Sequence, residues 1–318
     1  MAIQRYSRQE MQAIISNILR EDVTILPIGN HELRRHLVYR VNTKKGSFVF
    51  KYYYQDIYGG REISTLKLLE NSAIKRASLV DHGTFGMDRE WLMMDMLDGM
   101  PMDKIMKRMS KDNLVDVYYQ MGLALAHLHE SHTFDSFGDL RADGTFVKAY
   151  TNYREAFMAN NQYCYDKIYK STDIEKATYL KGIQAIENNL HLLDHVKQAR
   201  LTHMDYSPRN IFLAKEGDKR TLKAVLDFEL CRPWDKNADF CQLILRDFSG
   251  HPDYEQAFYE GYESLSSLDD SFAETLDFYM VNQCLHVCSW AKSVAPDYYK
   301  MAYDTLVDLL NHSKTLNL

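Results

Sequence analysis

The string from His203 to Asn210, HMDYSPRN, combines a carboxylate and a carboxamide at a spacing that suits phosphoryl transfer. This chemistry needs a carboxylate that orients a hydroxyl and accepts its proton, with an amide oxygen and a second carboxylate that hold Mg²⁺ against the phosphates. Asp205 and Asn210 offer the first two groups. Asp227, at the end of a predicted strand over residues 223–226, offers the third. We therefore expect the three side chains to converge on one site.

A cation that binds phosphates is expected on a strand upstream, and Lys51 at the end of Phe-Val-Phe-Lys supplies it. A lysine that is buried on a strand needs a carboxylate to hold its ammonium group. Glu62 lies eleven residues later on a predicted helix. Each residue alone is typical of a solvated surface, but their order and spacing favour an ion pair in the same site.

The elements that position these residues divide into two groups. A Ser7–Glu10 capping box begins a first helix, and a second helix is expected over 61–70. Short β-branched and aromatic runs separated by turn residues predict strands over 23–28, 37–42, 47–53, 78–84 and 90–96. Beyond residue 98 the pattern becomes helical from Ser110, with further helices over 151–170, 173–197, 237–248, 254–266, 270–291 and 297–312. We predict a β-rich lobe over 1–96 and a mostly helical lobe over 97–318.

The strings HMDYSPRN and VLDFE resemble the HGD-x-x-x-x-N and IDWE pair of the aminoglycoside phosphotransferase and choline kinase-like families. Lys51 and Glu62 resemble the family's ion pair, and residues 91–99 resemble its hinge strand. The resemblance implies an α+β, protein-kinase-like fold with two lobes. The first is a small antiparallel sheet with one long helix, which binds the nucleotide. The second is mostly helical and carries the catalytic loop, the metal site and the acceptor pocket.

The resemblance also implies roles for single residues. Asp205 corresponds to the catalytic base, and Asn210 and Asp227 correspond to the Mg²⁺ ligands, with ATP or GTP as co-substrate. It assigns nucleotide binding to Lys51, Glu62, Asp95, Met96 and Leu97. The last three of these would contact the adenine through their backbone.

Several positions depart from the family pattern or allow two interpretations. Met204 replaces the glycine of HGD, and the loop over 29–37 contains one glycine where family members often have several. Glu229 either approaches the metal or caps the next turn, and we favour the cap. His203 and Asp239 are expected to brace the catalytic loop. The histidines at 127, 129 and 132 have no further ligands at metal-binding spacing, so we expect exposed side chains at a helix end.

Composition narrows the partners and the compartment. Apolar segments are too short to span a membrane, no secretory signal is evident, and five cysteines form no CxxC pair, which favours the cytoplasm. Residues 230–318 carry 14 acids and 6 Lys or Arg, a balance of −8, so nucleic acid is a poor partner. The acids could line a pocket for a polycation, or they could lie on solvated helix faces. The candidates for the pocket are Asp235, Asp269, Asp270, Glu274 and Asp277.

These observations lead to a small-molecule kinase that transfers the γ-phosphate of ATP or GTP to a hydroxyl of an aminoglycoside-like acceptor, which would confer antibiotic resistance. One alternative is a metabolic kinase of the same fold that acts on choline, a sugar or an amino alcohol. Another is a catalytically silent binding or scaffold protein, which the sparse glycine loop favours and the complete set of metal ligands disfavours.

Overall fold

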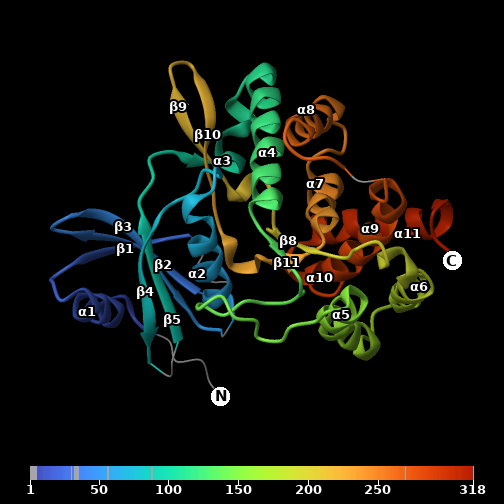
Figure 1. Cartoon of the computed structure of the whole chain (residues 1–318), viewed down its shortest axis with the longest axis horizontal. Coiled ribbons are helices and arrows are strands. Elements are labelled where there is room, and N and C mark those ends of the chain that lie inside the picture. Colours follow the sequence, from blue (N-terminus) through green and yellow to red (C-terminus); the bar gives the residue numbers. More distant parts are fainter. Residues whose placement is uncertain are drawn as a thin grey trace.

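A β-rich region lies beside a mostly helical one in the computed structural model (Figure 1), which describes residues 6–29, 31, 36–55, 57–86, 89–268 and 270–317. The β-rich region contains an antiparallel five-stranded sheet in the order β1-β2-β3-β5-β4. Each strand matches a predicted run within a few residues. The strands are β1 (Thr24–Ile28), β2 (His36–Thr43), β3 (Gly46–Tyr53), β4 (Leu79–Phe85) and β5 (Arg89–Asp95).

Two helices flank this sheet. Helix α1 (Arg8–Leu19) begins at the predicted capping box, and its Met11 and Ile15 pack into a core with the sheet. Helix α2 (Tyr58–Leu68) carries Glu62 and contacts the sheet and the turn that follows Asp227. Residues of α2 therefore lie between the β-rich region and the catalytic residues.

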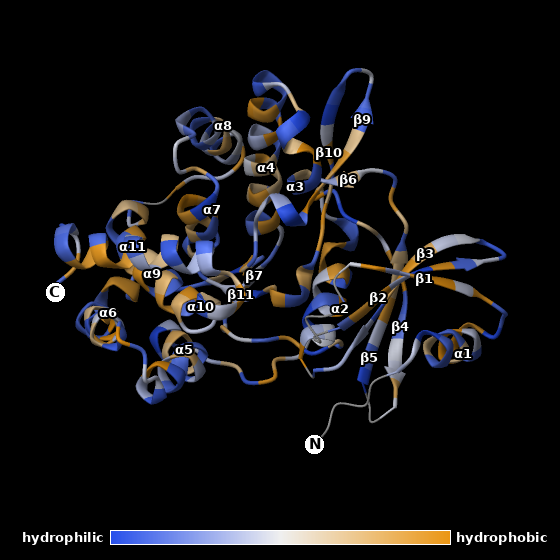
Figure 2. Ribbon diagram, turned by 180° about the vertical axis from the view of Figure 1, so that it is seen from behind, coloured by the Kyte–Doolittle hydropathy of each residue, from blue (hydrophilic) through white to orange (hydrophobic). Residues whose placement is uncertain are grey.

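The helical region is built around α4 (Lys111–Ser131) and α9 (Phe272–Cys288), each surrounded by a large apolar core. Figure 2 shows apolar residues gathered along α9, whereas the tip of the β9–β10 hairpin is hydrophilic. The other helices are α3 (Met102–Ile105), α5 (Tyr153–Lys170), α6 (Lys176–Asn188), α7 (Cys241–Arg246), α8 (Pro252–Glu263), α10 (Ala291–Val294) and α11 (Pro296–His312). The helical region also contains two three-stranded sheets, with the strand orders β10-β9-β6 and β11-β8-β7. Their strands are β6 (Met100–Pro101), β7 (Thr133–Phe134), β8 (Ala199–Thr202), β9 (Ile211–Glu216), β10 (Lys219–Val225) and β11 (Arg232–Trp234).

The segment over residues 135–150, for which the sequence predicts no element, crosses to the β-rich region before returning to α5 (Figure 1). Two isolated bridges, Phe137–Tyr150 and Leu140–Phe146, hold its two arms together. It contacts α2 through the Arg61–Asp139 ion pair at 2.7 Å and a 2.9 Å hydrogen bond from Lys67 to the Ala142 carbonyl. The segment thus fixes the helix that carries Glu62.

The predicted α+β fold class is confirmed, with an antiparallel sheet in the N-terminal part and helices in the C-terminal part. The division into lobes at residues 96 and 97 stays a prediction. Among the described residues, no helix has the length and apolar character needed to cross a bilayer.

Candidate active site

Lys51 lies at the centre of a group of carboxylates. It is on β3, between β2 and β5 in the sheet, and is only 3% exposed. Its Nζ is 2.7 Å from Glu62, 2.7 Å from Asp227 and 3.0 Å from Glu229. Burial would lower the pKa of this ammonium group, but the three carboxylates raise it well above its usual range. Lys51 is therefore charged, and the structure brings it to Glu62 as the sequence suggested.

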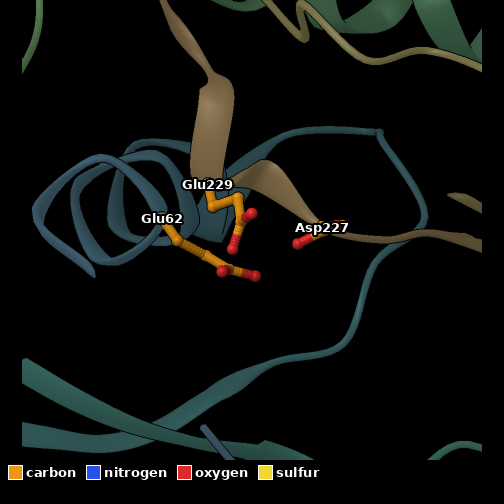
Figure 3. Close-up of side chains that lie close together, drawn as sticks. All are labelled: Glu62, Asp227 and Glu229. Carbon is orange, nitrogen blue, oxygen red and sulfur yellow. The ribbon is translucent and has the colours of Figure 1, made fainter. Parts of the chain in front are cut away.

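The three carboxylates point toward one another from α2 and from the turn after β10 (Figure 3). One oxygen of each of Glu62, Asp227 and Glu229 lies within 4.8 Å of the others. Burial and the neighbouring acids raise the pKa of Glu62, while Lys51 opposes this shift. Carboxylate oxygens are the ligands that Mg²⁺ prefers, and Lys51 Nζ already lies among these three groups. Asp227 has the most exposed side chain of the three, so its carboxylate fits a divalent cation beside Lys51.

Glu229 does not act as the turn cap that the sequence analysis favoured. Its carboxylate contacts Lys51 and also lies 2.8 Å from Nδ1 of His36 on β2. The left-handed backbone of Asp227, with φ of +63°, turns the chain immediately after β10 and directs both acids toward β3. This reversal is a tertiary feature that the string Asp-Phe-Glu alone does not reveal.

Asp205 is held in place by neighbours on the same loop and on α7. Asn210 Nδ2 donates to the Asp205 carbonyl at 2.8 Å and to its carboxylate at 3.1 Å. Gln242 Nε2 donates to the other carboxylate oxygen at 2.9 Å, and Arg209 lies 3.3 Å from that oxygen. Sequence reasoning missed Gln242; its one signal is the position one helical turn after Asp239. The carboxylate is thus oriented by two amide donors.

Asp239 braces the catalytic loop, as expected. Its carboxylate accepts the backbone N–H groups of His203 and Met204, both at 2.6 Å, and His129 Nε2 lies 3.0 Å away. His203 contacts the Leu226 carbonyl at 3.0 Å and so braces the loop through its ring. The expectation of exposed histidines is wrong for His129, which is completely buried because it joins α4 to Asp239. Met204 has a φ of +64°, the left-handed region that a glycine adopts without strain.

Two cavities meet this loop. The larger, of about 410 Å³, is lined by Lys51, Glu62, Asn210 and Asp227 and by the expected hinge residues Asp95, Met96 and Leu97. The second, of about 250 Å³, is lined by Met204 and Tyr206 on either side of Asp205 and by its partner Gln242. We call them the nucleotide cavity and the acceptor cavity.

The acids expected to form a polycation pocket lie elsewhere. Asp235, Asp270, Glu274 and Asp277 line neither of the two cavities, and Asp269 lies outside the described residues. Asp277 instead accepts hydrogen bonds from Ser313 and Thr315 near the C-terminus. Asp235 lies behind the wall of the second cavity, where the hydroxyl of Tyr279 donates to it, so none of these four acids lines the space beside Asp205.

Comparison with solved structures places this architecture among known phosphotransferases. One is the aminoglycoside phosphotransferase APH(4)-Ia, a thermostable mutant in complex with AMP-PNP and hygromycin B (TM-score 0.69, 13% identity, 94% of this chain and 97% of that chain). A putative fructosamine-3-kinase from Haemophilus somnus aligns with a TM-score of 0.61 at 14% identity, over 94% of this chain and 96% of that one. Spectinomycin phosphotransferase APH(9)-Ia, in complex with ADP and spectinomycin, aligns with a TM-score of 0.60 at 13% identity, over 98% of this chain and 100% of that one.

These likenesses establish the kinase-like fold. No curated protein sequence matches the chain. The model of the phosphotransferase enzyme family (APH) matches residues 29–273, which is more than half of the chain and includes every residue of the ion cluster and the catalytic loop. The chain therefore belongs to the phosphotransferase enzyme family and is a phosphotransferase that acts on hydroxyl acceptors.

Proposed function

We propose that the protein transfers the γ-phosphate of ATP or GTP to a hydroxyl of a small acceptor and uses Mg²⁺ as cofactor. The observation that carries this proposal is that Asn210 and Asp227 line the cavity of Lys51, while Asn210 also holds Asp205 through two hydrogen bonds. A phosphate-binding cation and two oxygen ligands therefore line one cavity, and the carboxylate base is hydrogen-bonded to one of those ligands.

Each group has a place in the reaction. Asp205 accepts the proton of the attacking hydroxyl, and the amides of Asn210 and Gln242 keep its carboxylate oriented. Lys51 binds the phosphates through its charged ammonium group. Asn210 and Asp227 would hold Mg²⁺, with Glu229 beside them, and the bound ion neutralises charge on the transferring phosphate. The backbone of residues 95–97 would meet the adenine or guanine base.

Two classes of acceptor have support, an aminoglycoside-like molecule and a metabolite. An aminoglycoside-like acceptor, and with it antibiotic resistance, is supported by the hygromycin B and spectinomycin complexes of the neighbours. A metabolic acceptor is supported by the fructosamine-3-kinase neighbour and by the absence of the four described candidate acids from the lining of either cavity. The second direction agrees better with the lining of the acceptor cavity.

The test is nucleoside diphosphate release from Mg·ATP and Mg·GTP in the presence of hydroxylated antibiotics and metabolites. Asp205→Ala should lower kcat by roughly 10²–10⁴-fold, the usual contribution of a positioned base. Asp253→Ala, which removes an exposed aspartate of α8, is the control. A wild-type rate in the Asp205 variant would overturn the mechanism. If Mg·nucleotide fails to raise the melting temperature, the chain is a silent scaffold instead.

A further inference from the structure

The acceptor cavity presents amide groups and a guanidinium group to its occupant. Its polar lining residues, apart from Asp239, include Asn160, Arg232, Gln242, Asn282, Gln283 and His286. Asp239 is the one carboxylate among the lining residues, and its oxygens already face two backbone N–H groups and His129. Apart from Asp205, which Gln242 contacts at the edge of the cavity, the described lining residues therefore offer no carboxylate that is available to an ammonium group.

Arg232 is the one guanidinium group among the described residues that line the cavity. It is 7% exposed and shares the single carboxylate of Asp139 with Arg61, at 3.4 Å and 2.7 Å respectively. Burial and Arg61 lower the pKa of Arg232 to about 10, so it stays protonated at neutral pH. Its Nε and Nη1 donate to Leu230 and Asn160, whereas Nη2 donates to none of the described residues. The Nη2 edge of the guanidinium therefore has no acceptor among the described residues, and the group lies over the Trp234 ring, 5.6 Å from its centroid.

Two aspartates lie near Arg232: Asp239 lines the cavity and faces the catalytic loop, and the buried Asp235 accepts a hydrogen bond from the hydroxyl of Tyr279. Burial, with Arg232 itself, lowers the pKa of His286 to about 4, so its ring is neutral at neutral pH. The Oδ1 atom of Asn282 is buried and has no hydrogen-bond partner among the described residues. A buried carbonyl oxygen without a partner is costly, and a ligand hydroxyl that donates to it would remove this cost.

The size of the cavity limits the occupant further. Its volume of about 250 Å³ is below the roughly 300–1,000 Å³ that is typical of pockets for drug-sized ligands. Aromatic side chains of Phe157, Trp234 and Tyr279 form part of the wall. A compact polyhydroxylated molecule suits this combination of amides and aromatic surface.

We propose that the acceptor is a hydroxylated molecule of about monosaccharide size that carries one acidic group, a carboxylate or a phosphate, which pairs with Arg232. This inference rests on the function proposed above and specifies its acceptor. A polycation is disfavoured because Asp239, the one carboxylate among the lining residues, already faces two backbone N–H groups and His129, whereas Nη2 of Arg232 donates to none of the described residues. The carboxamides of Asn282 and Gln283 are then positioned to select for hydroxyl groups.

The first experiment compares acceptors that share one carbon skeleton. The first set, on the glucose skeleton, contains D-gluconate, D-glucose 6-phosphate, D-glucose and D-glucosamine. The second, on the glycerol skeleton, contains D-glycerate, glycerol 3-phosphate, glycerol and serinol. Hygromycin B is the polycation. Diphosphate release is measured with Mg·ATP and Mg·GTP, and thermal shifts are measured with each probe alone. We expect the acidic members to bind and react best, and the carboxylate and phosphate arms identify the acidic group. Preference for the cationic members, or no response to any acidic member, would overturn the proposal.

The thermal shifts separate this proposal from the one on which it rests. If Mg·nucleotide neither stabilises the protein nor is consumed while acidic probes still bind, the kinase function fails and the acceptor assignment stands. If Mg·nucleotide stabilises the protein and cationic probes are phosphorylated, the acceptor assignment fails alone.

Substitutions then locate the acidic group. Arg232→Gln should raise KM for the acidic acceptor by roughly 10–100-fold, the value of a charged hydrogen bond, with no change in KM for Mg·ATP. If that variant does not fold, Asn282→Asp provides the test, because it places a carboxylate in the cavity. It should raise KM for the acidic acceptor by about tenfold and lower it for the matched amine. Asn188→Asp, the same change on the exposed side of α6, is the control. Unchanged KM values in Asn282→Asp would contradict the proposal.

Discussion

The two cavities beside Asp205 have opposite arrangements of buried charge. Among the described residues around the nucleotide cavity, three carboxylates surround the ammonium group of Lys51. Behind the acceptor cavity, two guanidinium groups share the carboxylate of Asp139. An excess of carboxylates favours a divalent cation, whereas an excess of guanidinium groups favours an anion. The comparison supports the occupants that we propose, a metal-bound nucleotide in one cavity and an acidic acceptor in the other.

Removal of the ammonium group tests the nucleotide side. Lys51→Met leaves Glu62, Asp227 and Glu229 together without their cation, and loss of one partner of a buried ion pair costs roughly 3–5 kcal/mol. We expect the free energy of unfolding in urea to fall by about this amount. Mg²⁺ should raise the melting temperature of the variant more than that of the wild type, because the ion replaces the missing charge. Lys104→Met, at an exposed lysine, is the control. An equal response to Mg²⁺ in both proteins would show that the carboxylates do not form a cation site.

The corresponding change on the acceptor side is Asp139→Asn. It leaves Arg61 and Arg232 near each other without a carboxylate, and the asparagine can keep one hydrogen bond. We expect a loss of about 2–3 kcal/mol in the free energy of unfolding, less than for Lys51 because Asp139 is 23% exposed at its side chain. Urea denaturation is the measurement, with Asp135→Asn in the same segment as a surface control. If chloride or phosphate fails to stabilise the variant, the guanidinium pair does not attract anions.

Acidification distinguishes the two cavities through His286. The pKa of this histidine is about 4 in the folded protein, below its usual 6.5, because of burial and Arg232. The unfolded chain therefore binds a proton first, and stability falls as the pH decreases from about 6.5 toward 4, by up to ~3 kcal/mol. His286→Gln should lose less stability than the wild type between pH 7.5 and pH 4.5 in urea titrations. His191→Gln, at an exposed histidine, should behave as the wild type does. Equal losses in all three proteins would contradict a neutral histidine in the acceptor cavity.

Met204 tests the loop that separates the cavities. Its backbone has a left-handed φ of +64°, which costs a non-glycine residue about 1–2 kcal/mol. Met204→Ala and Met204→Gly remove the same side-chain contacts, but only glycine relieves the backbone. Glycine also loses more chain entropy on folding than alanine, which offsets part of the relief. We therefore expect the free energy of unfolding of the glycine variant to exceed that of the alanine variant by about 1 kcal/mol. Equal unfolding midpoints would indicate that the loop holds Met204 without strain.

Much of the architecture is encoded in local sequence. Turn residues separate the strands of the sheet, a capping box begins α1, and the intervals between Lys51, Asp205 and Asp227 place them at the ends of short strands. The residues that sequence analysis missed act across long separations. Asp139 reaches Arg61 and Arg232, Gln242 reaches Asp205, and His129 reaches Asp239. No periodicity or motif spacing records such pairs, because each partner is typical of a solvated surface when considered alone.

The sequence by itself indicated the groups of the site: a lysine, three carboxylates and an asparagine at intervals that short strands, a helix and tight turns bring together. This was possible because backbone conformation over a few residues depends mainly on those residues. Only the tertiary structure decided that Glu229 joins the ion cluster and that Arg232 lines the acceptor cavity while the acids of the C-terminal part lie elsewhere. Burial and the distances between charges depend on how distant segments pack, and these quantities set the charge of each cavity.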